Sequence, residues 1–427
     1  MSKNILIVAL LLGSCLNSFA GGNLVSYTLY QTVTKEEFRE MLKKRHLPRA
    51  SAPAHYTVDV YDVTYYTQWH DGSQIKASGL YFVPRNVKKG AAELVYNHGT
   101  RVWKGRRKKL GGEEYFCLAM AMDGYAVALP DYIGLGHGDK FHLYQVASSL
   151  AQASVDMLLA VREINQDCDV KTNGQLFLSG YSEGGYAAMA TDKLIQDKYA
   201  GQLHVTAASP MSGAYDMTGV EGKVMFKSYT EPHYLPYLLG SYNEVYNIVG
   251  PNVNIIYKPP YDTLIPQISN FKHNLDDVVD LLPPVPADML KDTFVQMYLN
   301  DPNFPLIQKV RENNLYDWKP ESPMQLCYCD SDEQVTPLNA FVAYDKMKEN
   351  GAKHVTLRRA GKNFHHSRCA LVAMLYTKMY FDTFRQGSKY GGKGKVGSRL
   401  MADVAKVILA KASKGQGDGQ RKPRHKA

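Results

Sequence analysis

Cysteine is scarce in this sequence, with six residues among 427. A domain of this size does not need disulfide bonds for stability, so we expect buried free thiols. Cys327 and Cys329 would lie on the same side of one strand, where they are poorly placed to bond each other. No cysteine and histidine spacing matches a zinc site, so we expect no metal. Internal repeats are also lacking. Hydrophobic residues make up 45% and charged residues 21% of the chain, which excludes wholesale disorder.

An excess of one charge is missing from most of the chain. The formal net charge is +9, but residues 385–427 hold twelve Lys and Arg and two Asp, a net of +10. The residues before them therefore sum to −1. We expect residues 386–427 to form a flexible basic tail. The functional alternative is that this tail contacts a membrane surface or an anionic polymer. We do not expect it to recognise a specific nucleic acid.

Residues 1–20 have the three regions of an export signal. Lys3 supplies a basic start, residues 5–12 form an apolar run, and small residues precede Gly21. The apolar run is too short to span a bilayer. We therefore expect cleavage before Gly21 and export to the bacterial periplasm, the cell surface or the medium. The sequence L-G-S-C ending at Cys15 leaves open the alternative of a lipoprotein acylated at that cysteine.

Strand and helix patterns alternate along most of the chain. Residues 58–67 and 75–83 alternate in polarity around a turn, which predicts a β-hairpin. Apolar patterns predict further strands at residues 93–97, 125–129, 175–178, 205–208, 324–329 and 354–358. Amphipathic patterns predict helices at residues 35–44, 113–122, 146–164, 185–196, 337–349 and 367–384. Alternating βα units imply an α/β fold, with a mostly parallel central sheet flanked by helices.

The alternation stops between residues 215 and 321. This stretch is rich in Pro and Tyr, with seven Tyr between residues 229 and 261, and it is too long for a plain loop. We interpret residues 215–321 as a cap or lid inserted into a core made of residues 21–214 and 322–385. Its tyrosines either line a substrate cleft or pack the interior of the cap.

Residues 180–184 have the pattern G-x-S-x-G between a predicted strand and a predicted helix, with Ser182 at its centre. Such a turn holds a serine hydroxyl clear of the sheet, and the glycines remove Cβ atoms that would clash there. Unpaired N–H groups at the start of the helix favour negative charge near the serine. We predict that Ser182 is a catalytic nucleophile.

Residues 96–100, Y-N-H-G-T, end the first predicted strand after the hairpin. The loop at this place supplies one N–H of an oxyanion hole when a serine occupies the turn described above, and the residue after the serine supplies the other. We predict that Glu183 donates one N–H, with Gly99 and Thr100 as candidates for the other.

A carboxylate and an imidazole follow at two later strand ends. Asp332 lies between a predicted strand and a helix, where it would hold the tautomer of a histidine; Asp330 is the alternative. His366 begins the last predicted helix and is the preferred general base, with His365 as the alternative.

Three motifs together resemble the secretory lipase branch of the α/β-hydrolases. They are G-Y-S-E-G-G at residues 180–185, N-H-G-T at residues 97–100 and L-P-D-Y-I-G-L-G at residues 129–136. The chain order Ser, Asp, His also matches α/β-hydrolases. The resemblance covers about residues 56–384 and includes the insertion. It implies the α/β-hydrolase fold, an esterase or lipase that needs no cofactor, and a triad of Ser182, Asp332 and His366.

The expected function is hydrolysis of a carboxylic ester of a lipid, a glycan or a small molecule. A prolyl-type peptidase shares the triad order, and an acetyl- or feruloyl-type carbohydrate esterase is a further alternative. Outside enzymes, the alternative is a surface binding protein that keeps the fold without the chemistry. The basic run of residues 101–109 departs from the family pattern. It is either a site for an anionic substrate or a solvated loop.

Overall fold

The computed structural model describes residues 22–44, 53–105, 109–268 and 279–391. The predicted export signal with Cys15 and most of the basic tail lie outside the described residues, so both stay predictions. No helix in the described ranges is long and apolar enough to cross a bilayer.

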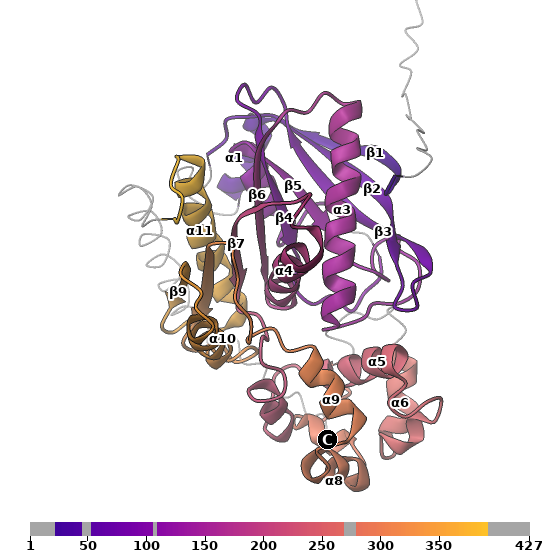
Figure 1. The fold of residues 1–427 in the computed structure, drawn as a ribbon. Coiled ribbons are helices and arrows are strands. Elements are labelled where there is room, and N and C mark those ends of the chain that lie inside the picture. Colours follow the sequence, from indigo (N-terminus) through magenta and orange to yellow (C-terminus); the bar gives the residue numbers. More distant parts are fainter. Residues whose placement is uncertain (1–21, 45–52, 106–108, 269–278, 392–427) are drawn as a thin grey trace, which may run out of the picture.

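A nine-stranded sheet forms the centre of the molecule (Figure 1). Its strands are β1 (Leu24–Val33), β2 (Val58–Gln68), β3 (Gln74–Pro84), β4 (Ala91–Asn97), β5 (Tyr125–Pro130), β6 (Thr172–Tyr181), β7 (Val205–Met211), β8 (Met324–Cys329) and β9 (Val355–Gly361). Their order across the sheet is β1-β2-β3-β5-β4-β6-β7-β8-β9. The first four strands in this order, from β1 to β5, pair antiparallel with their neighbours. The remaining pairs, from β5 and β4 across the sheet to β8 and β9, are parallel. The predicted hairpin and the mostly parallel sheet are therefore confirmed.

β1 is an addition to the predicted strands. It pairs with β2 at the edge of the sheet, and most of its side chains are partly or fully exposed. A strand that buries neither face completely leaves no clear alternation of polarity in the sequence, which explains why the pattern did not predict it. By contrast, every residue of β4 and β5 is buried. Strands covered on both faces appear as continuous apolar runs, and these two were predicted.

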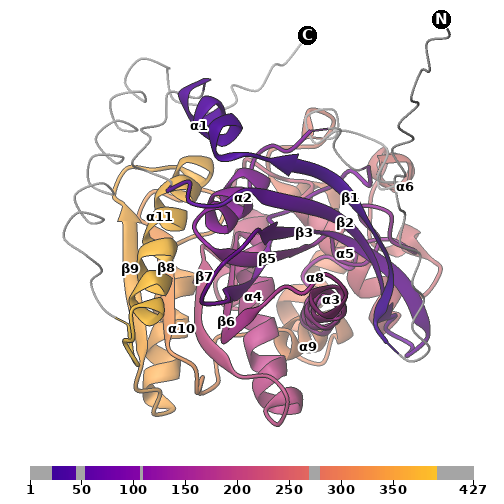
Figure 2. The same ribbon diagram turned by 90° about the horizontal axis from the view of Figure 1, so that it is seen from above.

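Helices cover both faces of the sheet (Figure 2). One face packs against α3 (Ala147–Asp167), α4 (Glu183–Leu194) and α10 (Leu338–Glu349). The other packs against α1 (Lys35–Lys44), α2 (Glu114–Met122) and α11 (His366–Arg385). α4 continues into one π-helical turn, Ile195–Tyr199. Two separate apolar clusters result, one on each side of the sheet.

The chain between β7 and β8 adds helices and no strand of the sheet within its described residues. Its α-helices are α5 (Tyr234–Tyr246), α6 (Tyr261–Ile268), α8 (Asp292–Asn300) and α9 (Pro305–Glu312). Short 3-10 turns are found at η3 (Glu221–Phe226), η4 (Val253–Ile255) and η5 (Pro286–Met289). In Figure 1 the four α-helices lie together beyond one end of the sheet. They add apolar side chains to the cluster on the α3 and α4 side.

Candidate active site

Ser182 occupies the turn between β6 and α4. Its backbone angles are φ 61° and ψ −124°, a region that residues with a side chain rarely adopt. Its N–H donates to the carbonyl of Met211 at 3.0 Å, which ties the turn to the end of the neighbouring strand β7. Backbone strain of this kind persists only where the surroundings enforce it, and it is concentrated at functional sites.

The glycines of the motif allow the turn to pack closely. A Cβ on Gly184 would lie 1.9 Å from the carbonyl oxygen of Asn97, and one on Gly180 would lie 2.2 Å from the carbonyl oxygen of Gly184. A Cβ on Gly185 would lie 2.3 Å from the carbonyl oxygen of Met211. The steric reason given for these glycines from the sequence is therefore confirmed.

His366 and Asp332 form a buried pair. The ring Nδ1 of His366 lies 2.8 Å and 2.9 Å from the two carboxylate oxygens of Asp332. The Asp332 side chain is 1% exposed, and one of its oxygens also accepts backbone N–H groups from Gln334 and Val335. With Nδ1 donating to the carboxylate, Nε2 of the ring is left as the basic nitrogen.

The two alternative residues have other partners. Asp330 lies 3.2 Å from the guanidinium of Arg359. His365 lies 3.2 Å from the carboxylate of Glu333, and its side chain is 38% exposed. Neither residue takes part in the buried pair.

The residue before Ser182 brings β6 and His366 together. The Tyr181 hydroxyl donates to the backbone carbonyl of His366 at 2.6 Å, and the two rings lie 4.8 Å apart between centroids. Glu333 holds the same residue from the other side, because its carboxylate accepts the His366 backbone N–H at 2.9 Å. The sequence reasoning assigned no role to either Tyr181 or Glu333.

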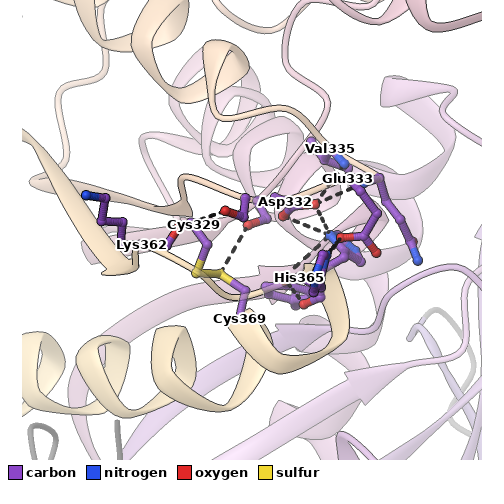
Figure 3. The surroundings of a disulfide bond; sticks show 12 residues. Cys329, Asp332, Glu333, Val335, Lys362, His365 and Cys369 are labelled. Atoms are coloured by element: carbon purple, nitrogen blue, oxygen red, sulfur yellow. Dashed lines mark hydrogen bonds and ion pairs between the residues drawn. A yellow bond between two sulfur atoms is a disulfide. The ribbon is translucent and has the colours of Figure 1, made fainter. Parts of the chain in front are cut away.

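A disulfide bond joins the two segments that carry the pair (Figure 3). Cys329 ends β8 three residues before Asp332, and Cys369 lies in α11 three residues after His366. The expectation that the thiols are all free is therefore wrong for these two. Cys117, Cys168 and Cys327 do remain free, and Cys168 is the exposed one among them. No local pattern predicts a bond between two cysteines 40 residues apart.

The N–H of Gly99, one of the predicted oxyanion donors, already has a hydrogen-bond acceptor. The N–H of Gly99 donates to the carboxylate of Glu113 at 3.0 Å, and the Tyr96 hydroxyl donates to the same carboxylate at 2.8 Å. Burial raises the pKa of Glu113. The prediction for Gly99 as a donor is therefore wrong, because its hydrogen is already bonded. Thr100 remains the candidate in this loop.

His98 supports the same loop. It is fully buried, and its ring Nδ1 lies 2.7 Å from the carbonyl of Gly99. Burial lowers the pKa of His98 to about 3, so the ring is neutral at physiological pH. Tyr132, from the D-Y-x-G-x-G motif, donates its hydroxyl to the carbonyl of His98 at 2.9 Å. This motif thus braces the loop beside Ser182.

The Glu183 side chain has a buried partner that the sequence did not predict. Its carboxylate lies 2.7 Å from Nε2 of His142, and both side chains are at most 1% exposed. Nδ1 of His142 lies 3.1 Å from the carbonyl of Ile133. The pair fixes the first residue of α4, whose backbone N–H is the other predicted oxyanion donor.

The basic run at residues 101–109 is partly neutralised. The Arg101 guanidinium lies 3.2 Å from Glu114 and 3.5 Å from Asp131. Lys104 donates to the backbone carbonyl of Lys140 at 3.1 Å. Residues 106–108 lie outside the described residues.

A cavity of about 130 Å³ opens at Ser182. Most of its lining is aliphatic and comes from η3, α5 and α9. Tyr229 and Tyr234 from the insertion line it, whereas Tyr242 and Tyr257 are buried in the interior. Some tyrosines of the insertion therefore line a cavity and others pack the interior, and a role in substrate binding stays a prediction. No group of three or more His, Cys, Asp or Glu in the described part of the chain is arranged to hold a metal ion.

Comparison with known proteins identifies the family and the structures that this chain resembles. The family model described as secretory lipase matches residues 108–231, which include the turn at Ser182. A candidate hydrolase from Legionella pneumophila is 27% identical, with a TM-score of 0.79 over 86% of this chain and 99% of that one. The chain has the α/β-hydrolase fold and is similar to the secretory lipases. No curated protein matches its sequence.

Two more distant structures share the hydrolase fold. The rice cell wall degrading esterase LipA from Xanthomonas oryzae is 23% identical, with a TM-score of 0.73 over 92% of this chain and 100% of LipA. Candida antarctica lipase A in its closed state is 13% identical, with a TM-score of 0.69 over 96% of this chain and 95% of the lipase.

The close packing at the turn predicts that Gly184→Ala is severely destabilising. Its Cβ would overlap a backbone carbonyl that cannot move without displacing β4, so we expect a loss of about 3 kcal/mol or failure to fold. Gly201→Ala is the matched control, because nothing lies within 4 Å of its added Cβ. Chemical denaturation of both variants checks this. Equal stability of the two would contradict the packing described for the turn.

The disulfide predicts a specific pattern of thiol reactivity. In the oxidised native protein we expect iodoacetamide to label Cys168, and to reach Cys117 and Cys327 only after unfolding. Peptide mass spectrometry without reduction should recover Cys329 linked to Cys369. Replacing both linked residues by Ala should lower the free energy of unfolding by about 3–4 kcal/mol, the loop-closure value for a loop of 40 residues. Labelling of either linked cysteine before reduction would disprove the bond.

Proposed function

We propose that this protein is an exported serine hydrolase that cleaves carboxylic esters through an acyl-enzyme formed on Ser182. The observation that carries the proposal is the His366–Asp332 pair, which is hydrogen-bonded through His366 to Tyr181, the last residue of the strand before Ser182. A hydroxyl, an imidazole and a carboxylate in this order are the components of a serine hydrolase triad. The match to the secretory lipase model and the esterase and lipase folds of the structural neighbours support an ester as the substrate.

Acylation starts at the serine hydroxyl. Nε2 of His366 takes the proton as Ser182 Oγ attacks the ester carbonyl, and Asp332 stabilises the imidazolium through Nδ1–H. The carbonyl oxygen becomes an oxyanion that accepts hydrogen bonds from the backbone N–H groups of Glu183 and Thr100. The tetrahedral intermediate collapses, and the alcohol leaves with the proton from His366.

Deacylation repeats these steps with water. His366 takes a proton from a water molecule, the resulting hydroxide attacks the acyl carbonyl, and the same two N–H groups stabilise the second oxyanion. Collapse of this intermediate returns the proton to Ser182 and releases the carboxylic acid. No cofactor enters either half of the reaction.

The cavity beside Ser182 favours an ester with an apolar portion. Its wall is mainly aliphatic, so burial of apolar substrate surface would supply binding free energy. A prolyl-type peptidase needs the same triad, and an acetyl- or feruloyl-type glycan esterase differs from a lipase in both the acid and the alcohol that it releases. A panel of aryl, glyceryl and acetylated sugar esters, together with an X-Pro amide, separates these alternatives.

The disulfide supports export, in addition to the export signal predicted at residues 1–20. Disulfide bonds persist in oxidising compartments outside the cytosol, and Cys329–Cys369 is such a bond beside the proposed triad. N-terminal sequencing of the mature protein distinguishes cleavage before Gly21 from processing at Cys15.

The triad proposal predicts that Ser182→Ala loses at least about 10⁴-fold in kcat for p-nitrophenyl esters and no longer reacts with a fluorophosphonate probe. The variant should keep its unfolding temperature, since it lacks one hydroxyl group only. Full ester turnover by this variant would refute the assignment of the nucleophile.

Two matched pairs of variants test the base and the acid. His366→Gln and Asp332→Asn should each lower kcat by roughly 10³–10⁴-fold, since one removes the base and the other its tautomer control. His365→Gln and Asp330→Asn change the same residue types nearby and should leave kcat within about threefold. Steady-state kinetics on all four variants checks this. A larger loss in either control than in its partner would reverse the assignment.

A further inference from the structure

The cavity at Ser182 contains one carboxyl side chain, Glu221 from η3. The remaining lining residues are aliphatic, aromatic or uncharged polar, and none of these described residues is Lys, Arg or His. Glu221 has no role in the ester hydrolysis proposed above. A carboxyl group in an apolar cavity is costly to maintain, so its presence calls for a reason.

The protein surrounds Glu221 with hydrogen-bond donors. The side-chain amide of Asn339, in α10, donates to one carboxylate oxygen. The backbone N–H of Thr336 also acts to lower the pKa of this carboxyl. Donors stabilise the ionised form of a carboxyl group, whereas a group meant to stay protonated needs an acceptor for its hydrogen.

No cation balances the charge of Glu221 in the described part of the chain. Asp332 and Asp216 are the charged groups that act on it, and both are acidic. Burial, together with these two carboxylates, raises the pKa of Glu221 to about 8 in spite of the donors. The hydrogen-bond donors by themselves therefore do not offset the cost of ionising Glu221 in the cavity. A positive charge in the cavity would favour the ionised carboxylate.

Aromatic rings stand close to the same carboxyl. Tyr144 and Tyr229 line the cavity; burial raises the pKa of both hydroxyls, and the carboxyl of Glu221 adds to this rise. Tyr234 also lines the cavity, and its ring centroid lies 5.7 Å from that of Tyr144 and 6.1 Å from that of Tyr229. Tyrosine rings attract cations through their negative faces, and they bind alkylated ammonium groups in other sites.

We propose that the cavity accepts esters that carry an ammonium group, with Glu221 as the counter-ion and Tyr144, Tyr229 and Tyr234 as its aromatic surroundings. This inference rests on the proposed ester hydrolysis and adds the chemical class of the substrate. The aliphatic part of the wall contacts the methylene groups that link the ammonium to the ester. The ammonium group of the substrate then balances the negative charge of the ionised Glu221 carboxylate.

The test compares substrates that differ only in charge. One pair is p-nitrophenyl 4-(trimethylammonio)butanoate and its isostere, in which a quaternary carbon replaces the nitrogen. The other pair is acetylcholine and the corresponding neutral dimethylbutyl acetate. The first pair places the cation on the acyl half of the ester and the second places it on the alcohol half. We expect the cationic member of at least one pair to have a kcat/KM roughly tenfold higher, equivalent to about 1.4 kcal/mol.

Glu221→Gln should abolish this preference, so that the cationic and neutral members of each pair have kcat/KM values equal within about threefold, because the amide keeps the shape and loses the charge. Glu244→Gln is the matched control, since Glu244 lies outside the cavity and close to His70. In the unaltered protein the cationic preference should grow as the pH rises through about 8, where Glu221 ionises, and this rise should be absent in Glu221→Gln.

The outcomes separate this inference from the proposed function. Turnover of the neutral esters with no cationic preference, or a preference that survives in Glu221→Gln, overturns the role of Glu221 and leaves the hydrolase intact. Absence of turnover for every ester, with no fluorophosphonate labelling, overturns the hydrolase itself. If Glu221→Gln does not fold, competitive inhibition of the unaltered protein by a trimethylalkylammonium ion is compared with its neutral carbon isostere. Equal inhibition by the two overturns the proposal.

Discussion

The buried pairing of His366 with Asp332 is the interaction on which the rest of the site depends. Burying a carboxylate is costly unless its oxygens accept several hydrogen bonds, and Asp332 receives them from the ring and from two backbone N–H groups. The pair forms only if two strand-end segments keep their relative position. The disulfide Cys329–Cys369 and the contact of Glu333 with the His366 backbone both join those two segments, so the covalent and the polar links stabilise the same alignment.

The turn at Ser182 shows a second constraint, which is space. Three glycines let α4 pack against the carbonyl groups that end β4 and β7, and any Cβ there would overlap backbone atoms. The same closeness places the first N–H of α4 next to the loop that follows β4. In that loop Glu113 binds the N–H of Gly99, which fixes the loop and leaves Thr100 as the proposed donor. The N–H of Gly99 therefore stabilises the conformation of this loop.

The sequence predicts what depends on neighbours along the chain. The pattern of strand, glycines and helix around Ser182 is local. β4 and β5, in which every residue is buried, also appear in the sequence as apolar runs. The choice between Asp332 and Asp330, or between His366 and His365, is different, because adjacent residues share the same local pattern. Which of them faces the site depends on strand and helix geometry. The disulfide, the contact of Glu113 with Gly99 and the position of Glu221 join residues far apart in the chain, so no local pattern contains them.

The acidic groups around the proposed oxyanion need an electrostatic account. A negative charge near a developing oxyanion raises its free energy, yet Glu183 and Glu113 both lie beside the donors. His142 bonds the Glu183 carboxylate, and burial raises the pKa of Glu113, so each has a feature that limits its negative charge. Glu221 has no such cationic or imidazole partner in the described residues and lines the cavity itself. Burial raises the pKa of Glu221 to about 8. An ammonium group bound beside it would favour the ionised carboxylate, so a cationic substrate brings the charge partner that the described residues do not supply.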